Sequence, residues 1–311
     1  MRIAMELRHL RNFVTVVEQK SISKAANIVR LAQPALSRQL QALENDLGAP
    51  LLVRHGWGIT PTPEGEVLAK SARSLLDQAQ AVRDAVGAAS GSPSGKLAIG
   101  VPSSMAEIVL PELALAAQRA LPRVELRLVE GYSATLRQRL LTGELDAAIL
   151  YADRRHSSLV TRPLLTESLV AFGPAGAFGT EAAISIEDLV ARNPIMPASA
   201  NQLRALFEEA AANIGLTATA AMEVDSVPAL LALVAAGAGV SVLPYSSIRH
   251  AVEKGRVSYA RISPQKLDRQ LVLARTQERI ETPSWNGIVN LLCEILSAGE
   301  QAYRWQVVKT E

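Results

Sequence analysis

Three polar side chains near the start of the chain have the chemistry needed to read DNA. Ser37, Arg38 and Gln41 fall on one face of a helix that the sequence predicts from about Gln33 onward. A hydroxyl, a guanidinium with parallel donors and an amide are groups that recognise base edges in a major groove. Another face of this helix is expected to pack on a core, because it carries four leucines at helical spacing: Leu36, Leu40, Leu43 and Leu47.

A shorter helix is predicted immediately before this one, ending near Arg30. Ser23 stands where its N-cap is expected, and Ala25 and Ala26 are small enough to let two helices approach closely. A scaffold helix, a tight turn and a second helix together make a helix-turn-helix, whose second helix enters the major groove. The segment therefore predicts a protein that reads double-stranded DNA.

The flanking sequence predicts the elements that position this motif. Residues 7–19 should form a first helix on the same core, with an apolar face of Leu7, Leu10, Val14 and Val17. Gly48 is placed to end the recognition helix in the left-handed conformation. Leu51–Arg54 and Ile59–Thr60 flank a short turn, which predicts a two-stranded wing.

A long helix is predicted after the wing. Thr62 and Pro63 supply a cap and a proline at the first helical position, and no proline interrupts the chain from there to about Ala89. Its apolar stripe consists of Val67, Leu68, Leu75, Leu76, Val82 and Val86. One helix alone cannot bury such a stripe, so we expect it to pair with the same helix of a second chain.

Composition limits the classes of protein to be considered. The 311 residues suffice for two to three domains, and a balance of 49% hydrophobic and 4% aromatic residues is typical of α/β and helical proteins. Residues 1–62 hold eight Lys/Arg against four Asp/Glu, whereas residues 91–311 hold 21 against 22. The excess positive charge thus lies where phosphate contacts need it, although such an excess is also ordinary for a solvated surface.

The single cysteine, Cys293, excludes a disulfide framework and a cysteine-rich metal site. It falls among aliphatic residues of a predicted C-terminal helix, which indicates a buried, inert thiol. Residues 1–5 have no apolar run long enough for a signal peptide and no segment approaches a membrane span, so a cytoplasmic protein is expected. Met5 is an alternative start of the chain.

Beyond a polar, Gly- and Ser-containing break at residues 88–95, short apolar strands alternate with helices. Strands are predicted at 97–101, 124–129 and 147–150, with helices near 105–121 and 133–142. The pattern repeats as a strand at 194–196, a helix near 201–214, a strand at 217–224, a helix at 226–236 and a strand at 240–243. This alternation predicts an α/β domain of parallel strands joined by helical crossovers.

Taken together, these motifs resemble the LysR-type transcriptional regulators. The matching residues are Leu7–Phe13, Ser23–Ala26, Gln33–Arg38, Leu43–Glu44, Leu47–Gly48, Leu51–Arg54 and Thr60–Gly65, and the resemblance continues along the whole chain. Within that family, the segments Ala32–Ser37, Pro197–Arg204 and Arg304–Val308 are most similar to the nitrogen-assimilation-control branch.

The chain departs from the family pattern at two places. Ala32 stands where Ser or Thr often caps the recognition helix, a loss of about 1 kcal/mol of capping. The wing has Arg54 and His55 but then Gly-Trp-Gly, where related wings carry further basic residues. Trp57 could wedge into a minor groove, and packing against the linker helix or a second subunit is the preferred expectation.

The resemblance implies a division of the chain. It comprises a winged helix-turn-helix domain (1–62), a linker helix that dimerises (63–90), a flexible hinge (91–96), an effector-binding domain (97–300) and a C-terminal tail (301–311). The effector domain is expected to have two lobes like a periplasmic binding protein, about 97–168 with 269–300 and about 169–268. A ligand would then lie between the lobes, at the carboxyl ends of the strands.

The resemblance also implies site residues and partners. DNA contacts are expected at Ser23, Lys24, Gln33, Pro34, Ala35, Ser37, Arg38, Gln41 and Arg54. In the cleft, Ser103, Ser104, Ser133, Ser199, Asn201 and Arg204 would hold a small anionic metabolite, with help from free N–H groups at helix starts. The serines could equally be plain helix caps, and Arg204 a solvated residue that pairs with Asp225. Promoter DNA, RNA polymerase and further copies of the chain, as a dimer or a dimer of dimers, are the other partners; no cofactor or metal is expected.

Three alternatives stay open at this point. A two-lobed α/β domain alone could belong to an enzyme, but the four histidines (9, 55, 156 and 250) have no metal-ligand spacing, and a Gly-x-Ser-x-Gly elbow is missing. An architectural DNA binder would not need the large, neutral C-terminal domain. A regulator controlled by its own abundance, without a small effector, differs least from the preferred interpretation.

Overall fold

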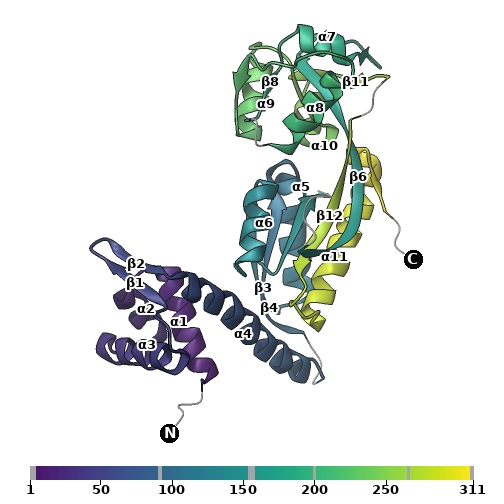
Figure 1. The fold of residues 1–311 in the computed structure, drawn as a ribbon. Helices are drawn as coiled ribbons and strands as arrows, with labels where there is room; N and C mark the ends of the chain where they lie inside the picture. Colours follow the sequence, from purple (N-terminus) through teal and green to yellow (C-terminus); the bar gives the residue numbers. More distant parts are fainter. Residues whose placement is uncertain (1–4, 90–92, 153–157, 199–200, 265–266, 309–311) are drawn as a thin grey trace.

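The chain folds into a small helical domain with a hairpin, one long helix and a two-lobed α/β domain, joined in sequence order (Figure 1). The computed structural model describes residues 5–89, 93–152, 158–198, 201–264 and 267–308. Within these ranges no helix is long and apolar enough to cross a membrane. The same ranges contain no group of three His, Cys, Asp or Glu side chains placed to hold a metal ion.

The small domain has the predicted helix-turn-helix and wing. It consists of α1 (Leu7–Gln19), α2 (Ile22–Val29), α3 (Gln33–Leu47), β1 (Leu52–His55) and β2 (Gly58–Pro61). Its core is formed mainly by Phe13, Val16, Ile22, Ala25, Ala26, Leu36, Leu40 and Leu43. Leu7 and Leu47, which were expected in this core, are 42% and 43% exposed. Each lies in a terminal turn of its helix, where the neighbouring helices no longer cover it.

Helix ends confirm one prediction and correct another. Gly48 ends α3 with a φ of 70°, the left-handed conformation that favours glycine. The N-cap of α2 is Ser21 and not Ser23, because the helix begins at Ile22 and the Ser21 hydroxyl accepts the N–H of Lys24 at 3.4 Å. Ser23 lies within the helix, exposed, and its hydroxyl donates to Gln33 Oε1 at 3.0 Å.

The long helix α4 (Pro63–Ala89) follows the wing directly. The Thr62 hydroxyl accepts the N–H of Gly65 at 3.0 Å, as expected of its cap. Gly65 lies so close to β1 that a Cβ there would stand 2.0 Å from the carbonyl oxygen of Leu51, so only glycine fits.

The apolar residues of α4 divide into two faces instead of one stripe. Leu68 and Leu76 pack on Leu10, Val14 and Ala72, and so bury themselves against α1 of the same chain. The other face is exposed and consists of Val67, Leu75, Val82 and Val86. Among the described side chains of α4, this second face is the one available to a partner helix, which corrects the prediction for Leu68 and Leu76.

Lobe I is a parallel sheet with helical crossovers, as predicted. Its strands run in the order β4 (Arg123–Gly131), β3 (Ser94–Pro102), β5 (Ala147–Tyr151) and β12 (Asp268–Thr276), the last antiparallel. Its sheet is packed by α5 (Ser103–Ala120), α6 (Ser133–Leu141) and α11 (Pro283–Tyr303). Residues 94–96 of the hinge predicted at 91–96 belong to β3, because Ser94 already pairs with Arg123 of β4; residues 91 and 92 lie outside the described ranges. The Cys293 side chain packs against this core but is half-buried, where a buried thiol was predicted.

Lobe II repeats the arrangement with shorter strands. Its elements are β7 (Ala183–Ile184), α7 (Ile186–Ala191), β8 (Ile195–Met196), α8 (Gln202–Ala212), β9 (Met222–Glu223), α9 (Val227–Ala235), β10 (Ser241–Pro244), α10 (Tyr245–Glu253) and β11 (Val257–Ile262). β10 is parallel to β8, and β8 to β9. The strand predicted at 217–224 is reduced to two residues, because only Met222 and Glu223 pair with β8.

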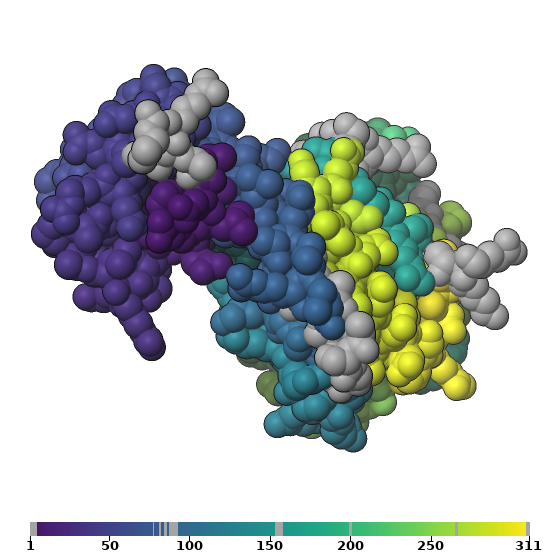
Figure 2. Space-filling view, turned by 90° about the horizontal axis from the view of Figure 1, so that it is seen from below, coloured from purple at the N-terminus to yellow at the C-terminus, as the bar shows by residue number. Residues whose placement is uncertain are grey.

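Two long strands connect the lobes (Figure 1). β6 (Leu159–Pro174) pairs with β12 in lobe I and with β10 and β11 in lobe II, near the predicted crossing points. Part of the predicted C-terminal tail forms a strand, because β13 (Trp305–Val307) pairs with β6 opposite Leu165–Glu167. Seen from below, α4 lies along the base of lobe I beside α11, which it contacts (Figure 2).

Candidate DNA-binding surface and ligand cleft

The predicted DNA-contacting side chains lie on the surface of the small domain. Ser23, Lys24, Gln33, Pro34, Arg38, Gln41 and Arg54 are exposed, and Ala35 and Ser37 are half-buried. On the same helix, Leu36, Leu40 and Leu43 are buried, so α3 presents its polar face outward because its leucine face is fixed in the core. As expected, Ala32 gives α3 no side-chain cap.

Two polar contacts hold α3 in place. The Asn12 amide donates to Gln39 Oε1 at 2.6 Å and joins α1 to the middle of the helix. The hydrogen bond from Ser23 to Gln33 joins α2 to its start. The face predicted to read bases is therefore carried by a helix that is fixed at its start and middle, which is the arrangement that major-groove recognition requires.

The wing is attached to the same helix. Glu44 Oε1, on α3, accepts the N–H groups of Leu51 at 2.8 Å and Leu52 at 3.3 Å. The N–H of Ile59 donates to the carbonyl oxygen of Lys20 at 3.0 Å. These bonds make α3 and the hairpin one rigid unit.

Trp57 does not pack against the linker helix of its own chain, so this half of the preferred expectation is wrong, whereas contact with a second subunit stays a prediction. Its side chain is 77% exposed at the tip of the hairpin. The ring stacks on His55 with centroids 4.6 Å apart and planes 2° from parallel. Gly56 and Gly58 surround it in the sequence, and neither supplies a side chain to cover the ring.

A cleft of about 550 Å³ lies between the lobes. Its floor is lobe I, where Pro102–Ser104 and Gly131–Thr135 follow the carboxyl ends of β3 and β4. The facing wall is lobe II, from Pro197, Ala198 and the start of α8. The cleft thus brings together Ser103, Ser104, Ser133 and Asn201, four of the six residues that the sequence predicts to hold a ligand.

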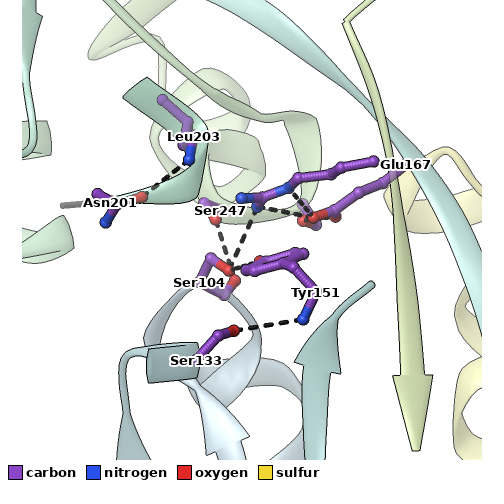
Figure 3. Close-up of polar contacts among 9 residues, drawn as sticks. Ser104, Ser133, Tyr151, Glu167, Asn201, Leu203 and Ser247 are labelled. Carbon is purple, nitrogen blue, oxygen red and sulfur yellow. Dashed lines mark hydrogen bonds and ion pairs between the residues drawn. The ribbon is translucent and has the colours of Figure 1, made fainter. Parts of the chain in front are cut away.

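Ser104 and Ser133 are both bonded to Tyr151, at the end of β5 (Figure 3). The Ser133 hydroxyl accepts the N–H of Tyr151 at 3.3 Å, and a hydrogen bond joins the hydroxyls of Ser104 and Tyr151. The N-cap residues of α5 and α6 are Pro102 and Tyr132 instead. The alternative that these two serines are plain helix caps is therefore wrong.

The Tyr151 phenol remains protonated over the physiological range. Burial raises the pKa of Tyr151 well above its ordinary value of 10, and the neighbouring Arg269 opposes this rise only in part. The hydroxyl can therefore donate a hydrogen bond at the floor of the cleft.

A buried ion pair, missed by the sequence analysis, lies beside Tyr151. Arg269 on β12 donates through Nε to Glu167 Oε1 on β6 at 2.8 Å, and the two side chains are 10% and 2% exposed. The Ser246 hydroxyl donates to the other carboxylate oxygen at 3.1 Å. The available signal was a charged residue two positions from the apolar run of each crossing strand, 164–165 and 271–274.

Of the residues that the sequence predicts in the lobe II wall, the structure places Asn201 in the cleft lining and Arg204 outside it. Asn201 lines the cleft, and its side chain accepts the N–H of Leu203 at 3.0 Å as the N-cap of α8. Arg204 is outside the cleft lining, because its guanidinium is held by Glu208 at 2.7 Å and by Glu223. Asp225, its expected partner, accepts the N–H of Ala198 at 2.9 Å instead. Ser199 lies outside the described residues.

The two walls of the cleft differ in their helix starts. In lobe II, Asn201 and Ser226 cap α8 and α9 with their side chains. In lobe I, the N-cap residues Pro102 and Tyr132 give α5 and α6 no side-chain cap. Uncapped N–H groups and the positive end of the helix dipole favour a carboxylate or phosphate, so an anionic group fits lobe I better than lobe II.

Two family models match the chain. The model of the bacterial regulatory helix-turn-helix proteins of the lysR family matches residues 7–66. The model of the LysR substrate binding domain matches residues 90–295.

Full-length relatives show the same organisation. The chain is 31% identical over 294 residues to the nitrogen assimilation regulatory protein nac of Klebsiella aerogenes, covering 94% of this chain and 96% of that protein. It is 30% identical to the nac protein of Escherichia coli (strain K12), covering 98% and 100%. Among solved structures, a full-length OxyR variant from Pseudomonas aeruginosa superposes with a TM-score of 0.78 at 25% identity, covering 99% of both chains. Full-length CbnR, complexed with its target DNA, has a TM-score of 0.61 at 26% identity, covering 94% and 100%.

Proposed function

The chain belongs to the lysR family of bacterial regulatory helix-turn-helix proteins and is a DNA-binding transcriptional regulator, and we propose that α3 carries its promoter specificity. In this proposal Arg38 and Gln41 contact base edges in a major groove, with Ser37 beside them. Ser23, Lys24, Gln33, Pro34 and Ala35 contact the backbone near the start of α3, and Arg54 contacts it from the wing. This assignment of base and backbone contacts follows from the side-chain chemistry. Guanidinium and amide groups can form bidentate hydrogen bonds to base edges, whereas most other protein–DNA contacts go to phosphates.

One observation carries this proposal. The polar face of α3 is exposed while its leucine face is buried, and the Asn12, Ser23 and Glu44 contacts fix the helix and wing as one unit. The CbnR structure contains its target DNA, which supports the same use of this domain here.

The functional assembly is proposed to be a dimer, or a dimer of dimers, formed first through α4. The exposed face of Val67, Leu75, Val82 and Val86 supports this, because pairing with a second α4 would remove it from water. Two recognition helices would then reach successive major grooves of one promoter. RNA polymerase is the proposed partner of the bound assembly.

The cleft between the lobes is proposed to bind a small anionic metabolite that adjusts regulation. The uncapped starts of α5 and α6, with Ser103, Ser104 and Ser133, would take the anionic group, and Asn201 would contact the ligand from lobe II. Arg204 is not part of this proposal. A regulator that binds promoters must reach the chromosome, so the proposed location is the cytoplasm. The two nac relatives support assignment of the chain to the nitrogen-assimilation-control branch of the family.

Selection of duplexes from a random pool by the full-length protein tests the DNA proposal. Sequencing the bound pool should give a site with two related half-sites, about one helical turn or a multiple of it apart. A pool that stays random after repeated selection at moderate salt would refute sequence-specific binding.

A further inference from the structure

The stacked rings at the tip of the wing have no role in the contacts described so far. Trp57 is 77% exposed, whereas Trp285 and Trp305 are 5% and 2% exposed. A single exposed apolar residue is ordinary on a protein surface. An indole that is held flat against an imidazole at the end of a hairpin forms a rigid, exposed apolar surface, which indicates a binding site for a partner molecule.

The ring pair is ordered before any partner arrives. His55 stacks on Trp57 with nearly parallel planes. A hydrogen bond of 2.9 Å between His55 Nε2 and Thr60 Oγ1 holds the imidazole across the hairpin. Fixing the rings in advance lowers the conformational entropy that binding would otherwise cost.

Position and charge favour nucleic acid as the partner. Through Glu44, Leu51 and Leu52 the wing belongs to the same rigid unit as the base-reading face of α3. Arg54, exposed on β1, precedes the ring pair, and residues 1–62 carry eight Lys/Arg against four Asp/Glu. An apolar protein partner gains little from that charge, whereas a phosphate backbone is attracted by it.

We propose that the Trp57–His55 ring pair enters the minor groove beside the major groove read by α3, and that it selects deformable base steps there. This inference rests on the proposed DNA binding by α3. A B-DNA minor groove is about 6 Å wide, so one ring fits edgewise, whereas two stacked rings require the groove to open. Pyrimidine–purine steps unstack most easily and therefore cost least to open. The wing thus adds sequence preference without a base-specific hydrogen bond.

Intrinsic fluorescence of the full-length protein tests the contact, because Trp57 is the exposed indole among the three. Titration with a duplex selected by the protein should quench and blue-shift the exposed component of the emission, and Trp57→Phe should remove most of this change. In the duplex, 2-aminopurine placed at the wing position should brighten on binding to the parent protein, since unstacking relieves its quenching. Trp57→Ala should abolish that brightening.

Affinity measurements give the expected size of the effect. Trp57→Ala should weaken binding about 5- to 20-fold on a duplex with a TA or CA step at the wing position, and His55→Ala should weaken it less. Replacing that step with a stiff A-tract should weaken the parent similarly and leave Trp57→Ala nearly unaffected. Ile280→Ala, which removes an apolar side chain 47% exposed outside the small domain, is the matched control and should leave affinity unchanged.

Three results would overturn the inference. In the first, the parent binds the selected duplex and Trp57→Ala binds it equally well on both steps. In the second, Trp57 emission follows protein dilution and not DNA, which would assign the ring pair to a contact between subunits. In the third, the parent selects no duplex at all, and then both the proposed DNA reading by α3 and the proposed minor-groove contact of the wing are refuted.

Discussion

The guanidinium carbon of Arg269 lies 3.8 Å from the centroid of the Tyr151 ring. Arg269 is also paired with Glu167, so it joins the floor of the cleft to both strands that connect the lobes. The Ser104 hydroxyl is hydrogen-bonded to Tyr151 and accepts from Arg269 Nη2 at 3.4 Å, and the Ser104 carbonyl oxygen accepts the Ser247 hydroxyl of lobe II at 3.0 Å. A ligand that moved Ser104 would therefore act directly on the two strands, β6 and β12, that connect the lobes.

Glu167→Gln should destabilise the effector domain strongly. The change leaves the Arg269 charge buried without its partner, which costs about 3–5 kcal/mol of unfolding free energy. Urea unfolding followed by the fluorescence of the buried Trp285 and Trp305 measures the loss in this domain. Glu181→Gln is the control, because its pair with Arg261 is 71% and 63% exposed and contributes less than about 1 kcal/mol. Equal losses for the two variants would contradict the assigned role of the buried pair.

The burial of the Asp146 carboxyl predicts that the stability of the folded protein depends on pH. Burial raises its pKa above the ordinary 3.8, and the Arg279 pair at 3.0 Å opposes this only in part. The folded state therefore binds the proton more readily, so the carboxyl contributes most stability below pH 3.8 and loses it as pH rises through the folded pKa. The thermal midpoint of the parent minus that of Asp146→Asn should fall as pH rises through this window. A difference that grows with pH would mean that the ion pair outweighs burial.

The local elements could be predicted because their patterns are local. The leucine spacing of 36, 40 and 43, the glycine at 48 and the proline at 63 each determine a helix face or a helix end without reference to the rest of the chain. Ser21 and Ser23 show the limit of such patterns. Both could cap a helix, and only the actual first residue of α2 decides between them.

The missed features depend on residues far apart in the sequence. Glu167 and Arg269 are separated by 102 positions, and neither has a local pattern that names its partner. The apolar spacing on α4 identifies the stripe but does not show that Leu76 packs near Leu10 while Leu75 is exposed. That difference depends on where α1 lies, which the sequence of α4 does not contain. The position of Arg204 near the start of a lobe II helix predicts a cleft residue, but Glu208, one turn later, holds its side chain elsewhere.

Arg38→Ala should weaken specific DNA binding by about 1–3 kcal/mol, the contribution of one bidentate contact to a base. Fold and oligomeric state should stay unchanged, because Arg38 is exposed. A mobility-shift titration on the selected duplex measures the loss, with Lys254→Ala, an exposed cation of lobe II, as the matched control. Unchanged affinity for Arg38→Ala would assign base reading to another residue of α3.

Leu75→Arg and Leu76→Arg should behave differently although the residues are adjacent. Leu75 belongs to the exposed face of α4, so a charge there should break the contact between chains and give smaller species by light scattering. Leu76 packs on the core formed with Leu10, so the same change should lower the thermal midpoint instead. If both variants kept the parent's size, the exposed face of α4 would not be the dimer contact.

Ser104→Ala should abolish the response to effector while leaving promoter occupancy intact. The variant removes the hydroxyl that joins α5 to Tyr151 at the floor of the cleft. This site belongs to a different domain from α3, so DNA binding should not be affected directly. A reporter fused to a mapped promoter, followed over several nitrogen and carbon sources, measures the response, and chromatin immunoprecipitation measures occupancy. Immunoblotting must show equal abundance, because the unfolding of a weakened lobe would imitate loss of the response.

Arg204→Ala is the control that the structure adds. Its guanidinium is held by Glu208 and Glu223 outside the cleft lining, so the variant should regulate like the parent once its abundance is matched. A ligand held at the starts of α5 and α6 predicts that Ser104→Ala and Ser133→Ala lose the response while Arg204→Ala keeps it. If all three regulate like the parent in every growth condition, and reporter output follows the amount of protein, the regulator is controlled by its abundance and the cleft is structural.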